Sequence, residues 1–182
     1  MGKKNILRIV SAGAVWIAVL LWMLFIYSMS AETSEQSGQT SGEVVDKIAD
    51  IIVPGYDELP EEEKESVKDK LSLPVRKLAH FTEYAVLGAL LALAVTLTGR
   101  HTVITTKKII IAFGIGCIYA FSDELHQSFV PGRGPSVTDV LIDCSGVICG
   151  TLSVIVIIYI IKRVIIRKAE KNKTADKECQ SF

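Results

Sequence analysis

Three groups of polar and ionisable side chains occur along this chain, each at a spacing that brings its members together on a helix. The groups are Arg76, His80, Glu83 and Tyr84; then Asp123, Glu124, His126 and Gln127; and finally Asp139 and Asp143. Most members of a group are three or four residues apart, which is the separation of neighbours on a helix surface. Arginine, imidazole and carboxylate side chains held together could bind an anion, exchange a proton or hold a metal ion.

A short loop between the second and third groups carries one more basic residue, Arg133. Pro131 and Gly132 suit the two central positions of a type II turn, in which glycine adopts a positive φ. The run from Ser136 to Asp139 predicts a capping box that opens the following helix. We therefore expect a stiff loop that holds the Arg133 guanidinium over the carboxylates, where its fork of donors suits a phosphate or a carboxylate.

The elements that must position these residues are apolar helices. The stretches Ile9–Tyr27 and Ser145–Ile161 contain no charged residue, although the whole chain has 20 basic and 20 acidic residues. About 20 helical residues cross the hydrocarbon of a bilayer. Four segments qualify as spans: about 9–29, 78–97, 107–127 and 138–161. The sequence predicts an all-α, four-span membrane bundle, and its zero net charge argues against nucleic-acid binding.

Basic residues indicate how the spans are oriented. They cluster in three segments: before residue 9, at Arg100, Lys107 and Lys108, and in the tail 162–182. An even number of spans separates these segments, so the positive-inside rule places both termini in the cytoplasm. We expect a multi-pass protein of the cell membrane whose basic cytoplasmic tail touches anionic lipid.

The segment from 30 to 73 is polar and is expected to lie outside the cell. Its part from 34 to 42 is rich in Ser, Gly, Gln and Thr and is predicted to be mobile. The next part, 43–53, places Val44, Val45, Ile48 and Ile52 on one face, which favours a short amphipathic helix on the membrane surface. Pro60, followed by three glutamates, predicts the start of a further helix.

Distance along each span places the ionisable residues at one level. With the helical rise per residue, Glu83, Asp123 and Asp143 lie about 22 to 28 Å from the basic end of their spans. That level is in the outer part of the hydrocarbon, where an isolated charge is costly. We therefore expect these side chains to face one another, or to face an outward-opening polar cavity built from the second, third and fourth spans.

Three runs of residues carry a family resemblance. They are Arg76-Lys-x-Ala-His80-Phe-x-Glu83-Tyr84-x-x-x-Gly88, then Ser122-Asp-Glu-x-His-Gln127 with Pro131-Gly-Arg133, and Asp139-x-x-x-Asp143-x-x-Gly146. Together they resemble the signature of the VanZ-like family, named after the teicoplanin-resistance protein VanZ, over about residues 9–161. The resemblance implies a small multi-pass cell-membrane protein with a role in tolerance of lipid-bearing glycopeptides. It implies no catalytic assignment.

Our favoured hypothesis is recognition of an amphiphile in the polar cavity. The ligand would be a lipid-linked cell-wall precursor, an anionic lipid or a lipoglycopeptide, with arginines paired to its anionic group. The candidate binding residues are the three groups above together with Arg133. Membrane lipid is the other expected partner.

Two alternatives remain open at the level of sequence. Glu83 or Asp123 could act as a general acid or base in hydrolysis or transfer on a lipid-linked phosphate substrate. Alternatively, pairs such as His80 with Glu83 and Asp123 with Arg133 could do no more than hold helices together.

Neither a metal nor a cofactor is predicted. His80 and His126 stand near several carboxylates, but the pattern lacks the tight spacing of a metal site. Small residues at Gly88, Gly146 and Gly150 predict points where helices pack closely, more often within a multi-span chain than between chains.

Overall fold

The computed structural model describes residues 3–99 and 103–179, and this part of the chain is helical and without strands. The elements are α1 (Lys3–Ser30), α2 (Ser34–Ile52), the 3₁₀ turn η1 (Tyr56–Glu58), α3 (Glu61–Thr98), α4 (Thr106–Gln127) and α5 (Val137–Cys179). Arg100, used above to orient the spans, lies outside the described residues. The all-α prediction is confirmed.

Four helices of the described chain, α1, α3, α4 and α5, are long and apolar enough to cross a membrane. Their outer surfaces are apolar: Leu20 of α1, Ile110 of α4 and Leu141 of α5 are each more than half exposed. Asp123 and Asp143, in contrast, are buried between the helices. A bundle with apolar side chains outside and carboxylates inside is suited to lipid rather than to water.

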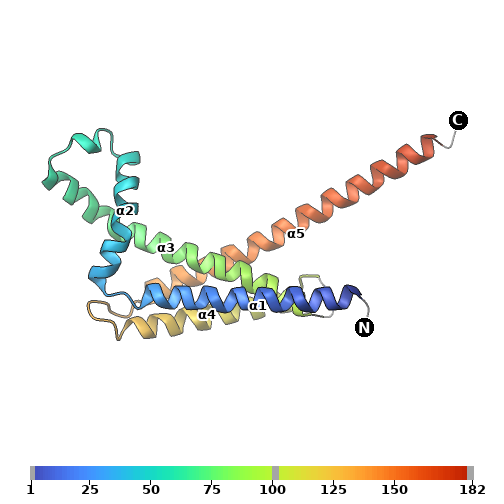
Figure 1. The fold of residues 1–182 in the computed structure, drawn as a ribbon, viewed down its shortest axis with the longest axis horizontal. Helices are drawn as coiled ribbons and strands as arrows, with labels where there is room; N and C mark the ends of the chain where they lie inside the picture. Colours follow the sequence, from blue (N-terminus) through green and yellow to red (C-terminus); the bar gives the residue numbers. More distant parts are fainter. Residues whose placement is uncertain (1–2, 100–102, 180–182) are drawn as a thin grey trace.

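The helices extend beyond the predicted spans at several ends. α3 begins at Glu61, directly after Pro60 as predicted, and continues through Pro74 without a break. α5 passes residue 161 and runs to Cys179, so the basic tail starts as a continuation of the fourth span. Figure 1 shows this part of α5 diverging from α1 and α4.

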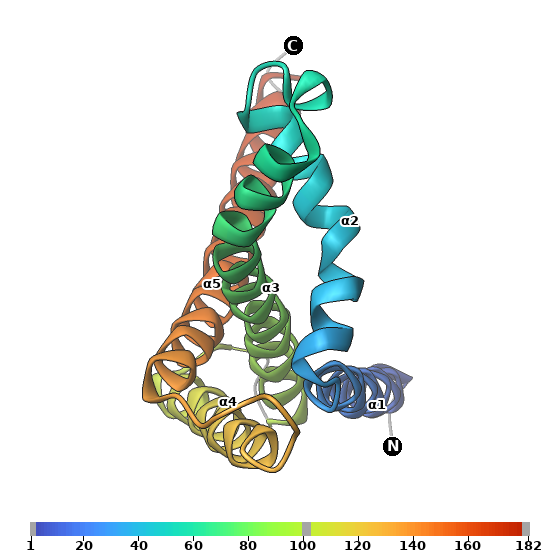
Figure 2. The same cartoon turned by 90° about the vertical axis from the view of Figure 1, so that its left-hand side faces the viewer.

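The polar segment after α1 folds back as a helical arm. Thr33 and Gln36 form a reciprocal capping box, which starts α2 at Ser34, so the prediction of a mobile stretch over 34–42 is wrong. The amphipathic helix predicted for 43–53 is the second half of α2. The arm of α2, η1 and the first half of α3 projects from the bundle (Figures 1 and 2), and α2 packs against α3.

Helix α3 is central, because α1, α2, α4 and α5 all pack against it. It crosses α5 where both helices carry small residues, as the sequence predicts. A Cβ atom at Gly150 would collide with the backbone of Ala85, one at Gly146 with that of Phe81, and one at Gly88 with that of Val147. The glycines therefore allow the two backbones to touch within one chain.

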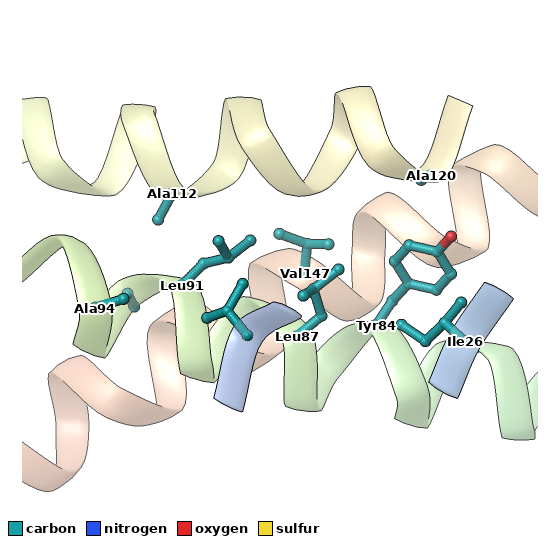
Figure 3. Packing of buried hydrophobic residues seen from close by; sticks show 10 residues of the cluster. Ile26, Tyr84, Leu87, Leu91, Ala94, Ala112, Ala120 and Val147 are labelled. Carbon is teal, nitrogen blue, oxygen red and sulfur yellow. The ribbon is translucent and has the colours of Figure 1, made fainter. Parts of the chain in front are cut away.

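The apolar core lies between α3 and its neighbours. Tyr84, Leu87 and Leu91 of α3 are fully buried, and Val147 of α5 packs between them and α4 (Figure 3). Gly116 of α4 leaves the space that the Val147 side chain occupies. This core fixes the positions of α3, α4 and α5, which carry the ionisable residues.

Candidate functional site

A polar cavity of about 160 Å³ lies where α3, the end of α4, the start of α5 and the loop between them meet. Its wall is formed by Ser34, Leu73, Arg76, Lys77, His80, Gln127, Gly132, Arg133, Gly134, Asp139, Ile142 and Asp143. We call this space the polar cavity. It brings together residues that lie as much as 109 positions apart in the chain, from Ser34 to Asp143.

The loop that carries Arg133 is built as the sequence predicts. The Arg133 amide donates to the Val130 carbonyl at 3.1 Å, and Gly132 has a φ of 78°, as the third position of a type II turn requires. Half of the predicted capping box is present, because the Asp139 amide donates to Ser136 Oγ at 3.3 Å. The turn places Arg133 in the wall of the polar cavity.

The other half of the capping box is supplied by a different helix. The Ser136 amide donates to Oε1 of Glu124, which is buried near the end of α4. Asp139 is therefore free to pair with Lys77 of α3, whose Nζ lies 2.9 Å from its Oδ1. One glutamate thus ties α4 to the start of α5, and Asp139 neutralises the lysine of the cavity.

Two arginines of the cavity have no such neutralising partner. Among residues 3–99 and 103–179, neither Arg76 nor Arg133 forms an ion pair. Arg133 Nε is buried and has no hydrogen-bond acceptor within the described chain. Burial lowers the pKa of the Arg133 guanidinium below its usual value, and the nearby charge of Arg76 lowers it further. The Arg133 guanidinium therefore keeps hydrogen-bond donors that an anion could accept from.

Asp143 and His80 form the inner wall. The Asp143 side chain belongs to a residue only 1% exposed, and its Oδ1 lies 3.9 Å from His80 Nδ1. That distance is too long for a hydrogen bond, and neither atom has another partner in the part of the chain described. The cavity therefore offers a carboxylate oxygen and an imidazole nitrogen as well as two guanidinium groups.

Asp123 belongs to a separate buried network. Its Oδ2 accepts a hydrogen bond from Ser30 Oγ at 2.7 Å, and Gln127 Nε2 donates to Ser30 Oγ at 3.0 Å. This network ties the last residue of α1 to α4. The predicted pairings of Asp123 with Arg133 and of His80 with Glu83 are wrong, because Ser30 takes the place of Arg133 and Asp143 is the acid beside His80.

Two predicted site residues point elsewhere. The His126 ring stacks on Tyr27 of α1, with ring centres 4.5 Å apart. Glu83 lines a second cavity of about 190 Å³ between α2, α3 and the end of α1, which we call the α2 cavity. Asp123, Glu124, His126 and Gln127 therefore have different partners, although all four lie at the end of α4.

The comparison with family models agrees with this architecture. The model of the VanZ/LLP1 family matches residues 15–161, which cover all or most of each of the four long apolar segments and the whole wall of the polar cavity. The chain belongs to the VanZ/LLP1 family. The predicted resemblance is therefore confirmed, and the four apolar helices make this VanZ/LLP1 chain a multi-pass membrane protein. No curated protein and no solved structure matched the chain.

Six predicted residues of the VanZ/LLP1 chain line the polar cavity and five do not. Those in its wall are Arg76, His80, Gln127, Arg133, Asp139 and Asp143. Those outside it are Glu83, Tyr84, Asp123, Glu124 and His126. Within the described ranges, no three His, Cys, Asp or Glu side chains are grouped as ligands of a metal ion.

Sequence reasoning missed three polar residues of this region. Lys77 lies in the wall beside Arg76, and its position three residues before His80 could have indicated it. Ser30 binds Asp123 and Ser34 lines the cavity, but both lie far from the motifs in sequence. No local spacing signal distinguishes these serines from the others in the polar segment.

Proposed function

We propose that this VanZ/LLP1 protein binds the anionic group of an amphiphilic envelope molecule in the polar cavity. The observation that carries the proposal is the pair of cavity arginines, Arg76 and Arg133, without an ion-pair partner among the described residues. Guanidinium groups bind phosphate and carboxylate with two parallel hydrogen bonds. An anion between them would supply the acceptor that the buried Arg133 Nε lacks.

The rest of the wall suits a head group that also carries donors. Lys77 is already paired with Asp139, so it adds little to anion binding. Asp143 Oδ1 is an unpartnered acceptor, which suits a ligand hydroxyl or amine better than a second anion. A phosphate or carboxylate next to a sugar-like group satisfies both requirements. Lipid-linked cell-wall precursors, anionic lipids and lipoglycopeptides all present an anionic or polar head on an apolar chain.

The structure offers less support for catalysis. The two candidate acids or bases, Glu83 and Asp123, do not line the polar cavity, and Asp123 is engaged by Ser30. A general base must reach the proton that it removes. Binding without chemistry needs only the residues that the cavity wall contains, so we favour it over hydrolysis or transfer.

The proposed location is the outer face of the cell membrane, with both termini in the cytoplasm. The basic residues at the start of α1, at the start of α4 and along the end of α5 support this orientation by the positive-inside rule. A protein that holds amphiphiles at the outer face would compete with, or sequester, lipid-bearing antibiotics. We therefore propose reduced susceptibility to teicoplanin-type glycopeptides as the resulting phenotype.

Lipid binding to the purified full chain tests the proposal. Native mass spectrometry in an uncharged detergent would compare phosphatidylglycerol with phosphatidylcholine. We expect a preference for phosphatidylglycerol that falls about tenfold to a hundredfold in Arg133→Gln or Arg76→Gln, since each removes charge-assisted hydrogen bonds. Arg167→Gln on the exposed end of α5 is the matched control, because it makes the same change of charge outside the cavity. Equal binding to wild type and Arg133→Gln would contradict the proposal.

A further inference from the structure

The α2 cavity shares part of its wall with the polar cavity. Arg76, His80 and Arg133 line both spaces, so the two cavities adjoin one another at these residues. The α2 cavity holds about 190 Å³, and although several lining residues are polar, most of the surface that they expose to the cavity is apolar. Apolar cavities of about 150 Å³ bind molecules of the size of benzene. The two spaces thus form two adjoining compartments, one more polar and one more apolar, which share Arg76, His80 and Arg133 in their walls.

Helix α2 leaves this space open by the small size of its side chains. Ser37, Thr40, Ser41 and Val44 line the cavity and lie three or four residues apart, on one stripe of the helix. Val44 is 49% exposed, whereas its neighbour Val45 is 2% exposed and packs in the arm. The sequence assigned both valines to one apolar face. In the structure, Val45 is buried on that face, whereas Val44 lines the α2 cavity and stays partly exposed.

Two acids make the α2 cavity unsuitable for an anion. Glu32 and Glu83 line it, and neither lines the polar cavity. Glu32 Oε1 accepts from Thr40 Oγ1 at 3.2 Å, which holds this carboxylate at the wall. An anionic head group would therefore lie on the arginine side, and an uncharged hydrocarbon chain would lie on the α2 side.

We infer that the α2 cavity is the subsite for the hydrocarbon chain of the ligand. The ligand class is then a lipid whose phosphate or carboxylate is joined directly to an alkyl or prenyl chain, so that the head contacts Arg76 and Arg133 while the first methylenes lie beneath α2. This inference rests on the proposed function, since the head group must occupy the polar cavity. It adds that binding depends on chain length.

The test uses a series of alkyl phosphates of one head group. Inorganic phosphate, hexyl phosphate and decyl phosphate are titrated calorimetrically into the full-length protein in an uncharged detergent. Each methylene that leaves water raises the affinity about fourfold, so hexyl phosphate should bind at least a hundredfold more tightly than inorganic phosphate. Partition into the detergent is measured with the Arg76→Gln, Arg133→Gln double variant and subtracted.

Variants that fill the α2 cavity separate the chain from the head. Ala79→Phe on α3 and Ser41→Leu on α2 place bulk in the α2 cavity and keep both arginines in the chain, and Leu78→Phe on the exposed face of α3 is the control. We expect both filled variants to lose at least tenfold in affinity for hexyl phosphate and to bind inorganic phosphate as the wild type does. Two variants from different helices guard against a folding defect in one.

Each outcome distinguishes the inference from the proposed function. Filled variants that bind hexyl phosphate as tightly as wild type would overturn the chain subsite and leave the head site intact. The chain subsite is supported if affinity rises with alkyl chain length equally in wild type and Leu78→Phe but does not rise in either filled variant. A wild-type protein that binds no phosphate of any chain length would overturn the proposed function itself.

Discussion

At the scale of single residues, the polar side chains of this protein divide by whether the chain itself satisfies them. Asp123, Glu124 and Asp139 receive hydrogen bonds from Ser30, Ser136 and Lys77, and they fasten helices to one another. Asp123 Oδ1 also keeps no partner in the described chain, but it lies outside the polar cavity, whose wall contains the unpartnered buried atoms of His80, Arg133 and Asp143. A buried polar atom without a partner costs about 1 to 3 kcal/mol. A ligand in the polar cavity would remove that cost, which is why we place binding there.

Glu124 provides a test of the fastening role. Glu124→Ala removes the acceptor of the Ser136 amide and should lower the free energy of unfolding by about 1.5 to 3 kcal/mol, the range for a hydrogen bond to a charged group. Glu124→Gln keeps an acceptor oxygen and should cost clearly less. Thermal unfolding of both variants in detergent measures the difference. Equal melting temperatures for Glu124→Ala and wild type would show that this cap does not stabilise the loop.

Local spacing predicted some of these residue-level features and could not predict others. The turn at Pro131–Gly132 follows from backbone preferences, and the structure has the positive φ at Gly132. The bonds of Glu124 to Ser136 and of Asp123 to Ser30 join separate helices, so they depend on how the helices pack. A capping box within 136–139 was a reasonable local choice, but a buried glutamate from α4 competes for the same amide.

At the scale of elements, the α3–α5 crossing positions the site. Hydropathy predicted the four spans, two of them from long uncharged runs and two from apolar segments that also carry charged residues. Helix α2 was missed over residues 34–42 because its composition is typical of loops, while its Thr33–Gln36 capping box was not considered. The helix predicted to start after Pro60 and the span predicted at 78–97 are one continuous helix, α3, which includes Pro74. Glycine spacing did predict the crossing, and Gly146 and Gly150 there face α3.

Gly150→Ala tests the crossing. The added methyl group would meet the Ala85 backbone, which cannot move aside as a side chain can, so we expect a loss of about 1 to 3 kcal/mol. Gly114→Ala is the matched control, since nothing lies within 4 Å of its Cβ position. That control should be neutral or slightly stabilising, because alanine favours a helix over glycine. Similar melting temperatures for the two variants would contradict the close contact of α3 and α5.

The outer end of the arm carries a pH-dependent contact. Lys68 Nζ lies 2.7 Å from Asp46 Oδ1, and the Tyr56 hydroxyl donates to the same oxygen at 3.0 Å. The hydrogen bond from Lys68 lowers the pKa of Asp46 below its usual 3.8, and Tyr56 lowers it further. The contact therefore stabilises the arm above pH 3.8 and is lost as the pH falls through the lower pKa of the folded state.

Hydrogen exchange measures this effect. The protection of α2 should decrease, severalfold at most for so exposed a pair, between pH 5 and about pH 3. Asp46→Asn should show weaker protection at pH 5 and a smaller change on acidification. If the variant and the wild type respond to acid alike, the contact does not hold α2 on α3.

At the scale of the whole molecule, the bundle presents apolar side chains outward and collects its unsatisfied polar groups at one end. That arrangement is suited to a molecule that enters from a lipid leaflet with its head at the polar end. The family, the span number and the site geometry are consistent with one another. The shape and charge of the two cavities determine which ligand can bind. These cavities form only when the helices pack together, so local sequence patterns do not predict them.

Antibiotic susceptibility tests the proposed phenotype. A strain without the gene, complemented with wild type, Arg133→Gln or Arg167→Gln, would be challenged with teicoplanin and vancomycin in parallel. We expect wild type and Arg167→Gln to raise the inhibitory concentration of teicoplanin at least twofold more than that of vancomycin, and Arg133→Gln to fail. No difference between the two antibiotics in any strain would remove the resistance proposal.

The most direct test of the central claim is a density map of the protein bound to decyl phosphate. We predict the phosphate within hydrogen-bonding distance of both Arg76 and Arg133, with the chain entering the space between α2 and α3. A phosphate bound instead along the basic end of α5, with the polar cavity holding only water, would contradict the claim.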